Sequence, residues 1–479
     1  MKVTLVVPNF RWAQWDKNTL WHFVPYNLCL LAAMIEDICD VKIVDANVQN
    51  MSENDLRTIL TEQNPDVVGI TVLMDQYGPS GHTAARVVKD INNNIKTVIG
   101  GVYATMNSQT VIADENIDYV VMGEGEYVFR DLLGYFMGKN KIPDTGVAYR
   151  FNGDVINGGH SDFIQNLDAL PLPAYHLIDF TMYSSKDFVT RESIDSPRDF
   201  PFARVYTSRG CPYGCCFCQV ESISGKKFRP RIAQKVLEEI RWLKEKYGIK
   251  SIIFDDDNLY TDKKRAKAIF RGMIEQGLSM PWLSMGVAVF RLDEEEIDLM
   301  HKSGCKYIDI AIESGSQRVL KEVIRKPVDY NQAKKMVKKA KEYGIYVAAN
   351  FIVGFPTETW DEIRATIRFA EELNVDYAKI FVAIPLRNTR LWDLSVETGA
   401  LKTNFNQPDI RWSNGQLETD EFTANDLTIL RAYEWDRINF TDPAKRKRAA
   451  EMMKITEEKL LMIRRDTLNA AISSLVKNT

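Results

Sequence analysis

The sequence is poor in several features that would fix the class of a protein at once. It has seven cysteines and five histidines in 479 residues, and 61 basic against 65 acidic side chains leave a formal net charge of −4. So few cysteines argue against a disulfide framework. A chain with almost no net charge also lacks the excess of positive charge that is typical of nucleic-acid-binding proteins. No uninterrupted apolar run approaches the roughly 18 residues that span a bilayer. We therefore expect a cytoplasmic chain that binds no nucleic acid and has no membrane span.

The first 140 residues alternate short apolar runs with amphipathic helical patterns. The runs cover residues 3–8, 41–45, 67–72, 97–101 and 119–123, and the helical patterns cover 26–38, 53–63, 83–92, 108–114 and 127–136. The first run is too short for a signal peptide and is interpreted as a strand. The alternation predicts an α/β domain over residues 1–140 with a doubly wound, Rossmann-like parallel sheet. Ligands of such sheets bind beyond the carboxyl ends of the strands.

A second alternation follows a connector at residues 141–200, in which residues 151–154 are typical of a hairpin turn. From 201 to 395, amphipathic helices end at a glycine or an asparagine and lead into strands expected at 204–207, 251–255, 282–287, 307–312, 346–353 and 377–382. Six strands with crossover helices favour a partial (β/α)6 TIM-like barrel, with a second doubly wound sheet as the alternative. Residues 396–479 are predicted to form a helical C-terminal domain.

Four of the seven cysteines lie within eight positions, directly after the first barrel strand. Cys211, Cys215 and Cys218 stand in a C-x3-C-x2-C register, and Cys216 is interpreted as a packing residue. Structural zinc typically needs four ligands, commonly as two separated pairs, and the sequence has no second pair; redox thiols are the other alternative. Three thiolates on a four-iron cluster leave one iron open for a substrate or cofactor. We therefore interpret the three cysteines as ligands of a [4Fe-4S] cluster.

The cysteine spacing, with an aromatic residue before the last cysteine, resembles the radical S-adenosylmethionine (SAM) superfamily over about residues 203–392. The resemblance implies that the open iron chelates the methionyl group and that the reduced cluster releases a 5′-deoxyadenosyl radical. It also implies contacts to the methionyl amine, the ribose and the adenine at the ends of the second, fourth and fifth strands. For residues 255–257 a helix N-cap remains an alternative. The implied SAM-binding residues are Phe217, Asp256, Glu313, Ser314, Asn350 and Gly354.

A doubly wound domain ahead of such a barrel resembles the cobalamin-binding members of the superfamily. Glycines at strand ends would let backbone amides approach this bulky cofactor closely, although glycine is also common there without a ligand. The implied cobalamin contacts are Asn9, Thr71, Leu73, Met74, Asp75, Gly100, Gly101, Val102, Tyr103, Gly123, Glu124, Gly125 and Glu126.

One feature of many cobalamin proteins is missing, namely the histidine of the D-x-H-x-x-G motif that binds cobalt. Asp75 is present, but Tyr77 occupies the histidine position, and His82 is interpreted as a surface residue at a helix start. The resemblance therefore implies base-off cobalamin without a histidine ligand, with Leu73 or Met74 below the cobalt. An aromatic loop after the first strand either covers a ligand or packs against the second domain; it contains Arg11, Trp12, Trp15, Trp21 and His22.

Three functions are compatible with these features. The favoured one is a radical SAM methyltransferase that methylates an unactivated carbon through the 5′-deoxyadenosyl radical and methylcobalamin. The alternatives are an enzyme of the same group without methyl transfer (an oxidative cyclase, ring-contracting or C–C bond-forming enzyme) and a cobalamin-responsive regulatory module without catalysis. A methylthiotransferase is disfavoured because the N-terminal domain carries only Cys29 and Cys39. The expected partners are a small-molecule or biosynthetic-intermediate substrate and an external electron donor of the flavodoxin or ferredoxin type.

Overall fold

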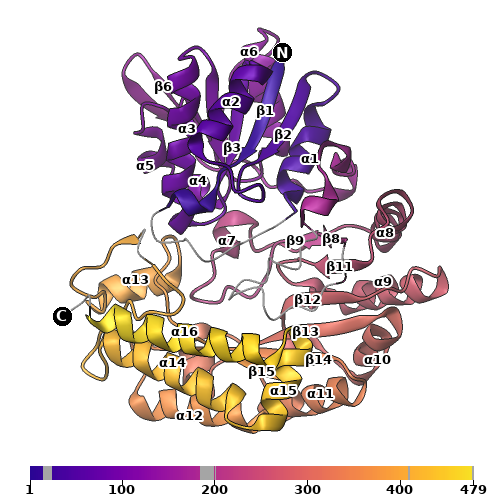
Figure 1. Cartoon of the computed structure of the whole chain (residues 1–479), viewed down its shortest axis with the longest axis vertical. Helices are drawn as coiled ribbons and strands as arrows, with labels where there is room; N and C mark the ends of the chain where they lie inside the picture. The colour runs from indigo at the N-terminus through magenta and orange to yellow at the C-terminus, as the bar shows by residue number, and fades with distance from the viewer. Residues whose placement is uncertain (14–23, 184–198, 200, 408–409, 477–479) are drawn as a thin grey trace. The chain divides into compact units, whose positions relative to one another are not determined.

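The computed structural model describes residues 1–13, 24–183, 199, 201–407 and 410–476 of the chain (Figure 1). Side chains are described up to residue 469. The predicted aromatic loop falls largely outside this part, because Trp15, Trp21 and His22 are not among the described residues. The chain divides into two compact units, Met1–Thr190 with Ser222–Ser224 and Arg191–Glu221 with Gly225–Thr479. No helix in the described ranges is long and apolar enough to cross a membrane.

The N-terminal unit is built on a seven-stranded sheet in the order β2-β1-β3-β4-β5-β6-β7. Its first five strands are parallel: β1 (Lys2–Val7), β2 (Asp40–Asp45), β3 (Val67–Thr71), β4 (Lys96–Gly100) and β5 (Tyr119–Val121). The helices are α1 (Tyr26–Ile35), α2 (Glu53–Gln63), α3 (Gly78–Ile91), α4 (Val102–Met106), α5 (Ser108–Ile112) and α6 (Gly125–Phe136). The predicted Rossmann-like sheet is thus confirmed, because each apolar run became a buried strand.

The sheet extends further than the sequence indicated. Strands β6 (Val147–Phe151) and β7 (Asp154–Asn157) add to it in antiparallel fashion, although they lie in the stretch interpreted as a connector. The predicted hairpin turn joins them, with Asn152 and Gly153 at φ 51° and 90°. Two positive φ angles are what a two-residue hairpin turn of the I′ type requires.

The C-terminal unit contains a six-stranded sheet in the order β15-β14-β13-β12-β11-β8, with all neighbours parallel. The strands are β8 (Phe202–Val205), β11 (Ser251–Phe254), β12 (Trp282–Val287), β13 (Cys305–Glu313), β14 (Tyr346–Val353) and β15 (Tyr377–Val382). They alternate with α8 (Ala233–Tyr247), α9 (Lys263–Glu275), α10 (Glu294–Ser303), α11 (Tyr330–Glu342) and α12 (Trp360–Glu372). The order never reverses and β8 does not pair with β15, so the partial barrel is confirmed over a doubly wound sheet.

The predicted helix ends are confirmed by backbone conformation. Residues Gly248, Gly277, Gly304, Gly344 and Asn374 all adopt positive φ. This conformation ends a helix in the left-handed region, where glycine and asparagine are best tolerated. The local sequence therefore determined where each helix stops and the next strand can begin.

The C-terminal segment is helical, as predicted, with α13 (Arg390–Glu397), α14 (Ala424–Phe440), α15 (Pro443–Met452) and α16 (Glu457–Val476). Helix α14 covers the open edge of β15. The buried side chain of Asn439 donates from Nδ2 to the oxygen of Ala378 at 2.7 Å and accepts at Oδ1 from its nitrogen at 2.7 Å. One amide thus replaces the missing neighbour strand, which is one way proteins protect a sheet edge.

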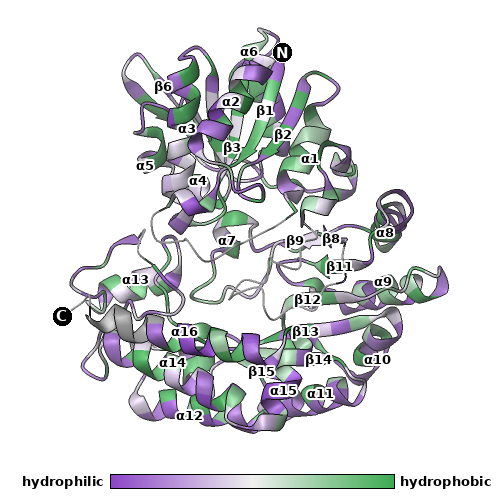
Figure 2. Ribbon diagram, viewed as in Figure 1, coloured by the Kyte–Doolittle hydropathy of each residue, from purple (hydrophilic) through white to green (hydrophobic). Residues whose placement is uncertain are grey.

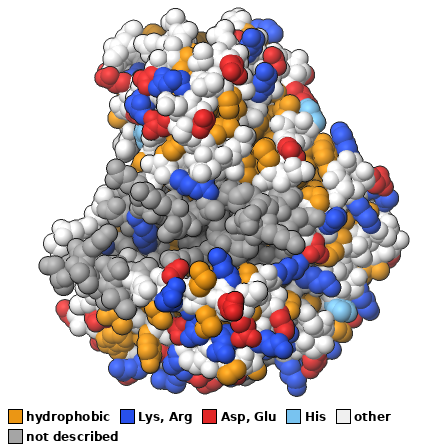
Figure 3. Space-filling model, viewed as in Figure 1, with side chains coloured by type: hydrophobic (Ala, Val, Ile, Leu, Met, Phe, Trp, Pro, Cys, Tyr) orange, Lys and Arg blue, Asp and Glu red, His pale blue; other side chains and the backbone are white. Residues whose placement is uncertain are grey.

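The distribution of polarity fits two ordinary folded cores. Hydrophobic residues concentrate in the central strands, while the surrounding helices carry both hydrophobic and hydrophilic positions (Figure 2). On the face that Figure 3 presents, basic and acidic side chains are interspersed.

Candidate active site

The cysteine loop follows β8 at the carboxyl end of the barrel sheet. All four of its cysteines are free thiols; Cys211, Cys215 and Cys218 are partly exposed, whereas Cys216 is 2% exposed. The backbone of Cys216 is held on both sides, because its nitrogen donates to the oxygen of Ile324 at 3.2 Å and its oxygen accepts from the nitrogen of Leu391 at 2.7 Å. Cys216 therefore has the surroundings of a packing residue, and the other three remain available as ligands.

Three side chains after β11 hold the start of this loop. Asp256 accepts at Oδ1 from the nitrogen and hydroxyl of Thr207 at 3.0 and 2.7 Å and from the hydroxyl of Ser208 at 2.5 Å. Asp257 accepts from the nitrogen of Gly210 at 2.7 Å, and Asn258 donates to the thiolate of Cys211 and so lowers the pKa of that residue, which burial raises. These carboxylates are committed to the loop that presents the cysteines.

This arrangement differs from the roles considered for residues 255–257. The first oxygen of Asp256 is bonded to the loop, and its second oxygen is buried without a hydrogen-bond partner. The N-cap of α9 is Asp262, whose side chain accepts from the nitrogen of Arg265, so the alternative of a helix cap at 255–257 is wrong. The resemblance predicts a methionyl contact for Asp256, which stays a prediction; the structure shows that Oδ1 of this side chain also positions the cysteine loop.

Gly210 explains why the loop can turn sharply just before its first ligand. Its φ is +85°, and a Cβ at this position would lie 2.2 Å from the carbonyl oxygen of Lys227. An L-residue would be strained and would also collide with backbone, so the turn requires glycine.

Burial affects the acidity of the proposed ligand thiols. Burial raises the pKa of Cys215 to about 11 and that of Cys218 to about 12, so binding iron there displaces protons from the thiols. Among the described residues, no group of three or more Cys, His, Asp or Glu side chains is placed to hold one metal ion. A cubane cluster binds its thiolates at different iron atoms, which is the role proposed for these three thiols.

The residues that resemble SAM contacts lie in the cysteine loop, at the end of β13 and in or just after β14. Glu313 ends β13 with its Oε1 2.7 Å from the Nζ of Lys326, and the hydroxyl of Ser314 lies 3.1 Å from that of Thr366. Asn350 donates to Asp309 at 2.8 Å, and the rings of Phe217 and Phe355 lie 6.5 Å apart. The structure thus brings these residues to one end of the sheet, each with a partner inside the protein.

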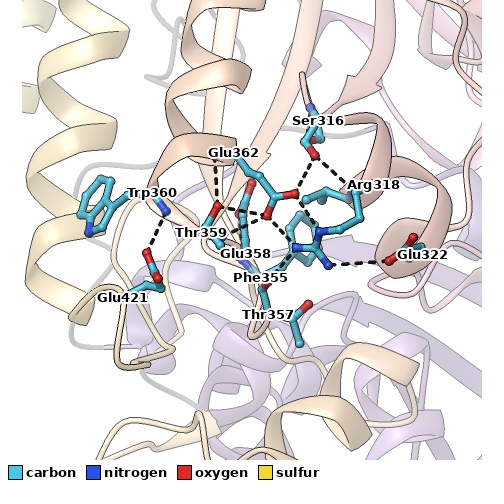
Figure 4. Close-up of polar contacts among 12 residues, drawn as sticks. Ser316, Arg318, Glu322, Phe355, Thr357, Glu358, Thr359, Trp360, Glu362 and Glu421 are labelled. Atoms are coloured by element: carbon cyan, nitrogen blue, oxygen red, sulfur yellow. Dashed lines mark hydrogen bonds and ion pairs between the residues drawn. The ribbon is translucent and has the colours of Figure 1, made fainter.

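The loop after β14 is fixed by its own acidic residue. The nitrogens of Gly354 and Phe355 donate to Oε2 of Glu358 at 2.6 and 3.1 Å, and burial raises the pKa of Glu358 to about 8. Figure 4 shows the adjoining network, in which Arg318 reaches Glu362 at 2.6 and 2.8 Å. This network joins the segment after β13 to the start of α12.

In the N-terminal unit the candidate cofactor edge lies at the switch point between β1 and β3. There the chain passes from β1 to β2 on one side and then to β3 on the other, and ligands of doubly wound sheets generally bind at such a switch point. Asn9, after β1, donates to the oxygen of Met51 at 2.9 Å, and Thr71, at the end of β3, accepts from Asn27 at 2.9 Å. Both side chains hold loops in place at this edge.

The residue at the usual cobalt-histidine position is turned into the protein. Tyr77 is buried and stacks on Phe10 with ring centroids 4.0 Å apart. Leu73 and Met74, on the same loop, are partly exposed. Asp75 accepts from Asn107 at 2.8 Å. The residues of this loop therefore fit a corrinoid that receives no ligand to cobalt from it.

The sequence predicts His82 as a surface residue at a helix start; its side chain is 27% exposed near the start of α3 and also has partners inside the protein. It is half-buried in α3, with Nδ1 2.6 Å from a carboxylate oxygen of Asp114 and Nε2 3.0 Å from the hydroxyl of Tyr103. These contacts connect the starts of α3 and α4 through a chain of three polar groups. Burial raises the pKa of Tyr103 to about 12, so this hydroxyl is neutral at physiological pH.

The remaining strand-end positions have partners of their own. Gly101 has φ +95°, and a Cβ there would lie 2.5 Å from the oxygen of Val72; Gly123 lies against His160 in the same way. The carboxylate of Glu124 accepts from the nitrogen of Ile164 at 2.6 Å. Gly100, Gly101, Val102, Gly123 and Gly125 are partly exposed, and Glu126 is buried. Packing thus accounts for the glycines at positions 101 and 123, which do not by themselves indicate a cofactor.

Comparison with known proteins assigns both units. Residues 205–370 match the model of the radical SAM superfamily, and residues 22–133 match that of the B12 binding domain. The uncharacterized methyltransferase PH0819 of Pyrococcus horikoshii is 35% identical over 85% of this chain and 85% of its own. The chain belongs to the cobalamin-binding radical SAM enzymes. Its cofactors are accordingly a [4Fe-4S] cluster, SAM and cobalamin.

A further relative and a solved structure are also similar to this chain. The cytidylyl-2-hydroxyethylphosphonate methyltransferase of Streptomyces wedmorensis is 30% identical over 76% of this chain and 74% of its own. The solved structure of the radical SAM methyltransferase TsrM from Kitasatospora setae has a TM-score of 0.67 and 17% identity, over 94% of this chain and 91% of that chain. At this identity the match supports the α/β fold of the enzyme.

Sequence reasoning missed several residues of this enzyme's candidate site. Lys326 and Asp257 are the clearest, because one pairs with Glu313 and the other holds the cysteine loop. Lys326 lies among other basic residues in a stretch rich in helices, and nothing in the neighbouring sequence indicates that it would pair with Glu313. Asp257 carried a signal, since three acidic residues in a row after a strand are unusual, but only the fold shows what they face.

Proposed function

We propose that this enzyme is a cobalamin-dependent radical methyltransferase that methylates an unactivated carbon of a small molecule. The observation that carries the proposal is one chain in which a three-thiol loop at a barrel mouth is joined to a cobalamin-type sheet. The two curated relatives named above are both called methyltransferases, which supports methyl transfer over other radical chemistry. When bound, the cluster supplies the electron that cleaves SAM and cobalamin carries the methyl group.

Under this proposal, residues 1–140 bind cobalamin, 141–200 connect, 201–395 hold the cluster and SAM, and 396–479 form the helical domain. Cys211, Cys215 and Cys218 bind three corners of the cluster. The proposed SAM-binding residues are Phe217, Asp256, Glu313, Ser314, Asn350 and Gly354. The substrate is a small molecule, and the electron comes from a flavodoxin- or ferredoxin-type donor.

The cobalamin part of the proposal concerns the lower face of cobalt. The buried stack of Tyr77 on Phe10 removes the usual histidine position, and Leu73 or Met74 offers no nitrogen. We expect the electron paramagnetic resonance spectrum of the cob(II)alamin enzyme to lack nitrogen superhyperfine splitting. Splitting from a protein or benzimidazole nitrogen would overturn this assignment.

The decisive experiment is anaerobic reconstitution with iron, sulfide and cobalamin, followed by mass spectrometry of the products of SAM under reducing conditions. A methyltransferase yields S-adenosylhomocysteine together with 5′-deoxyadenosine. Formation of 5′-deoxyadenosine alone would favour the alternative without methyl transfer, and the absence of both would favour a regulatory module.

Single alanine variants test the ligands. Replacing Cys211, Cys215 or Cys218 should abolish formation of 5′-deoxyadenosine, because each substitution removes one of the three thiolate ligands of the cluster. The matched control is Cys216→Ala in the same loop, which should retain it. Product formation by any of the first three variants would refute the ligand assignment.

A further inference from the structure

Two residues with left-handed backbone lie close together in the C-terminal unit. Glu313 has φ 74° at the end of β13, just after a register shift between Ala311 and Glu313. Arg325 has φ 66° directly after the π-helix Val319–Ile324. Such conformations cost about 1–3 kcal/mol in residues other than glycine and persist where the surroundings impose them. Short π-helical turns are rare and frequently occur at functional sites.

Together these distortions form one buried ion pair. Lys326 directly follows the turn at Arg325, and its Nζ lies 2.7 Å from Oε1 of Glu313. Both side chains are buried, with Lys326 7% exposed and Glu313 5% exposed. The free energy needed to remove two charges from water offsets most of the attraction between them, so a buried ion pair generally contributes little to the stability of the fold. Since the ion pair adds little stability and its two backbone positions are strained, we infer that the pair has a functional role.

The ion pair lies beside the cysteine loop. The oxygen of Ile324, two residues before Lys326, accepts the hydrogen bond from the nitrogen of Cys216. Lys326 interacts electrostatically with the thiols of Cys211, Cys215 and Cys218, and Glu313 interacts with that of Cys215. The pair and the three thiols thus form one electrostatic group.

We propose that Lys326 and Glu313 set the reduction potential of the cluster held by Cys211, Cys215 and Cys218, with opposite effects. This inference rests on the proposed function. The step is the uptake of one electron from a flavodoxin- or ferredoxin-class donor, which takes the [4Fe-4S] cluster from the 2+ to the 1+ state with no bond made or broken at either residue. The added negative charge is stabilised by the ammonium and destabilised by the carboxylate, because both lie in a buried site with little screening.

The test is a potentiometric titration of the reconstituted full chain without SAM, followed by electron paramagnetic resonance of the reduced cluster and by iron content. Lys326→Gln should lower the reduced-to-oxidised ratio at a given potential at least tenfold, which is a shift of about 59 mV for one electron. Glu313→Gln should shift the ratio in the opposite direction. Lys326→Arg keeps the charge and should stay near wild type. The control is Lys321→Gln, which removes an exposed lysine from the same π-helix.

The two directions separate this proposal from a structural role. If the pair only supports the fold, breaking it from either side should change the potential in the same direction or not at all, and either result overturns the proposal. If Lys326→Gln fails to hold iron, the signs of Glu313→Gln and Lys326→Arg against wild type still decide. If the two variants shift the potential in opposite directions but the enzyme makes no S-adenosylhomocysteine, this inference is supported and methyl transfer is refuted. If the potentials are unchanged but both products form, methyl transfer is supported and this inference is refuted.

Discussion

Asp45 is a carboxylate enclosed at the end of β2. It accepts from the nitrogens of Asn47 and Val48 at 3.1 and 2.9 Å and from the hydroxyl of Tyr183 at 2.9 Å. Burial raises its pKa from the ordinary value of 3.8 to about 6. The folded chain therefore holds this proton to a higher pH than the unfolded chain does. The contribution of Asp45 to stability is full below about pH 4 and is lost as the pH rises through about 6.

The corresponding prediction concerns the N-terminal unit. Relative to Asp45→Asn, which does not titrate, wild type should lose about 2 kcal/mol of unfolding free energy between pH 4 and pH 7. Denaturant unfolding at several pH values, with hydrogen exchange of β2 to identify the transition, measures the difference. A difference that stays constant with pH would contradict the assigned pKa direction.

A second prediction concerns Asp256, whose one oxygen receives three hydrogen bonds from Thr207 and Ser208. Asp256→Ala leaves these buried donors without an acceptor, at a cost on the order of 3 kcal/mol, and so releases the start of the cysteine loop. We expect iron bound after reconstitution to fall at least threefold, with a smaller loss in Asp256→Asn.

The control for this prediction is Asp361→Ala, at a side chain that is 92% exposed in the same unit. It should bind as much iron as wild type. Full iron content in Asp256→Ala would show that the loop does not depend on this carboxylate.

At the scale of elements, the open side of the barrel depends on one contact between helix and strand. Asn439 of α14 is the partner of both backbone groups of Ala378 in β15. Asn439→Ala leaves a buried N–H and C=O unpaired, and we predict a loss of about 3 kcal/mol in the stability of the C-terminal unit. Hydrogen exchange of the β15 amides measures it. The matched control is Ile429→Ala, at an exposed position of the same helix; equal exchange in both variants would refute the sealing role.

At the scale of the molecule, the two compact units should respond to different cofactors. A ligand at one hundred times its dissociation constant stabilises the site it binds by about 2.7 kcal/mol. We predict that hydroxocobalamin added to the apo chain slows hydrogen exchange in β1, β3 and β4 and leaves β13 and β14 unchanged. Reconstitution with iron and sulfide alone should protect the C-terminal unit instead. Cobalamin protection confined to β13 and β14 would contradict the assignment of residues 1–140.

The sequence by itself determined the features that depend on near neighbours along the chain. Apolar runs gave eleven strands close to their observed bounds, because burial imposes a local pattern. The glycines that end helices and the spacing of Cys211, Cys215 and Cys218 were also readable, since a left-handed turn and a three-thiol loop are short-range requirements.

Only the tertiary structure decided which partner each polar side chain meets. Asp256 faces Thr207 across 49 positions, and Asn439 faces Ala378 across 61. The hairpin β6–β7 joins the sheet because β5 would otherwise be an unpaired edge strand. Lys326 reaches Glu313 because it follows a π-helix, which the hydrophobic periodicity of the sequence does not predict. Such contacts are specified by the packing of whole elements, which brings distant residues together and sets the charges around the cysteine loop.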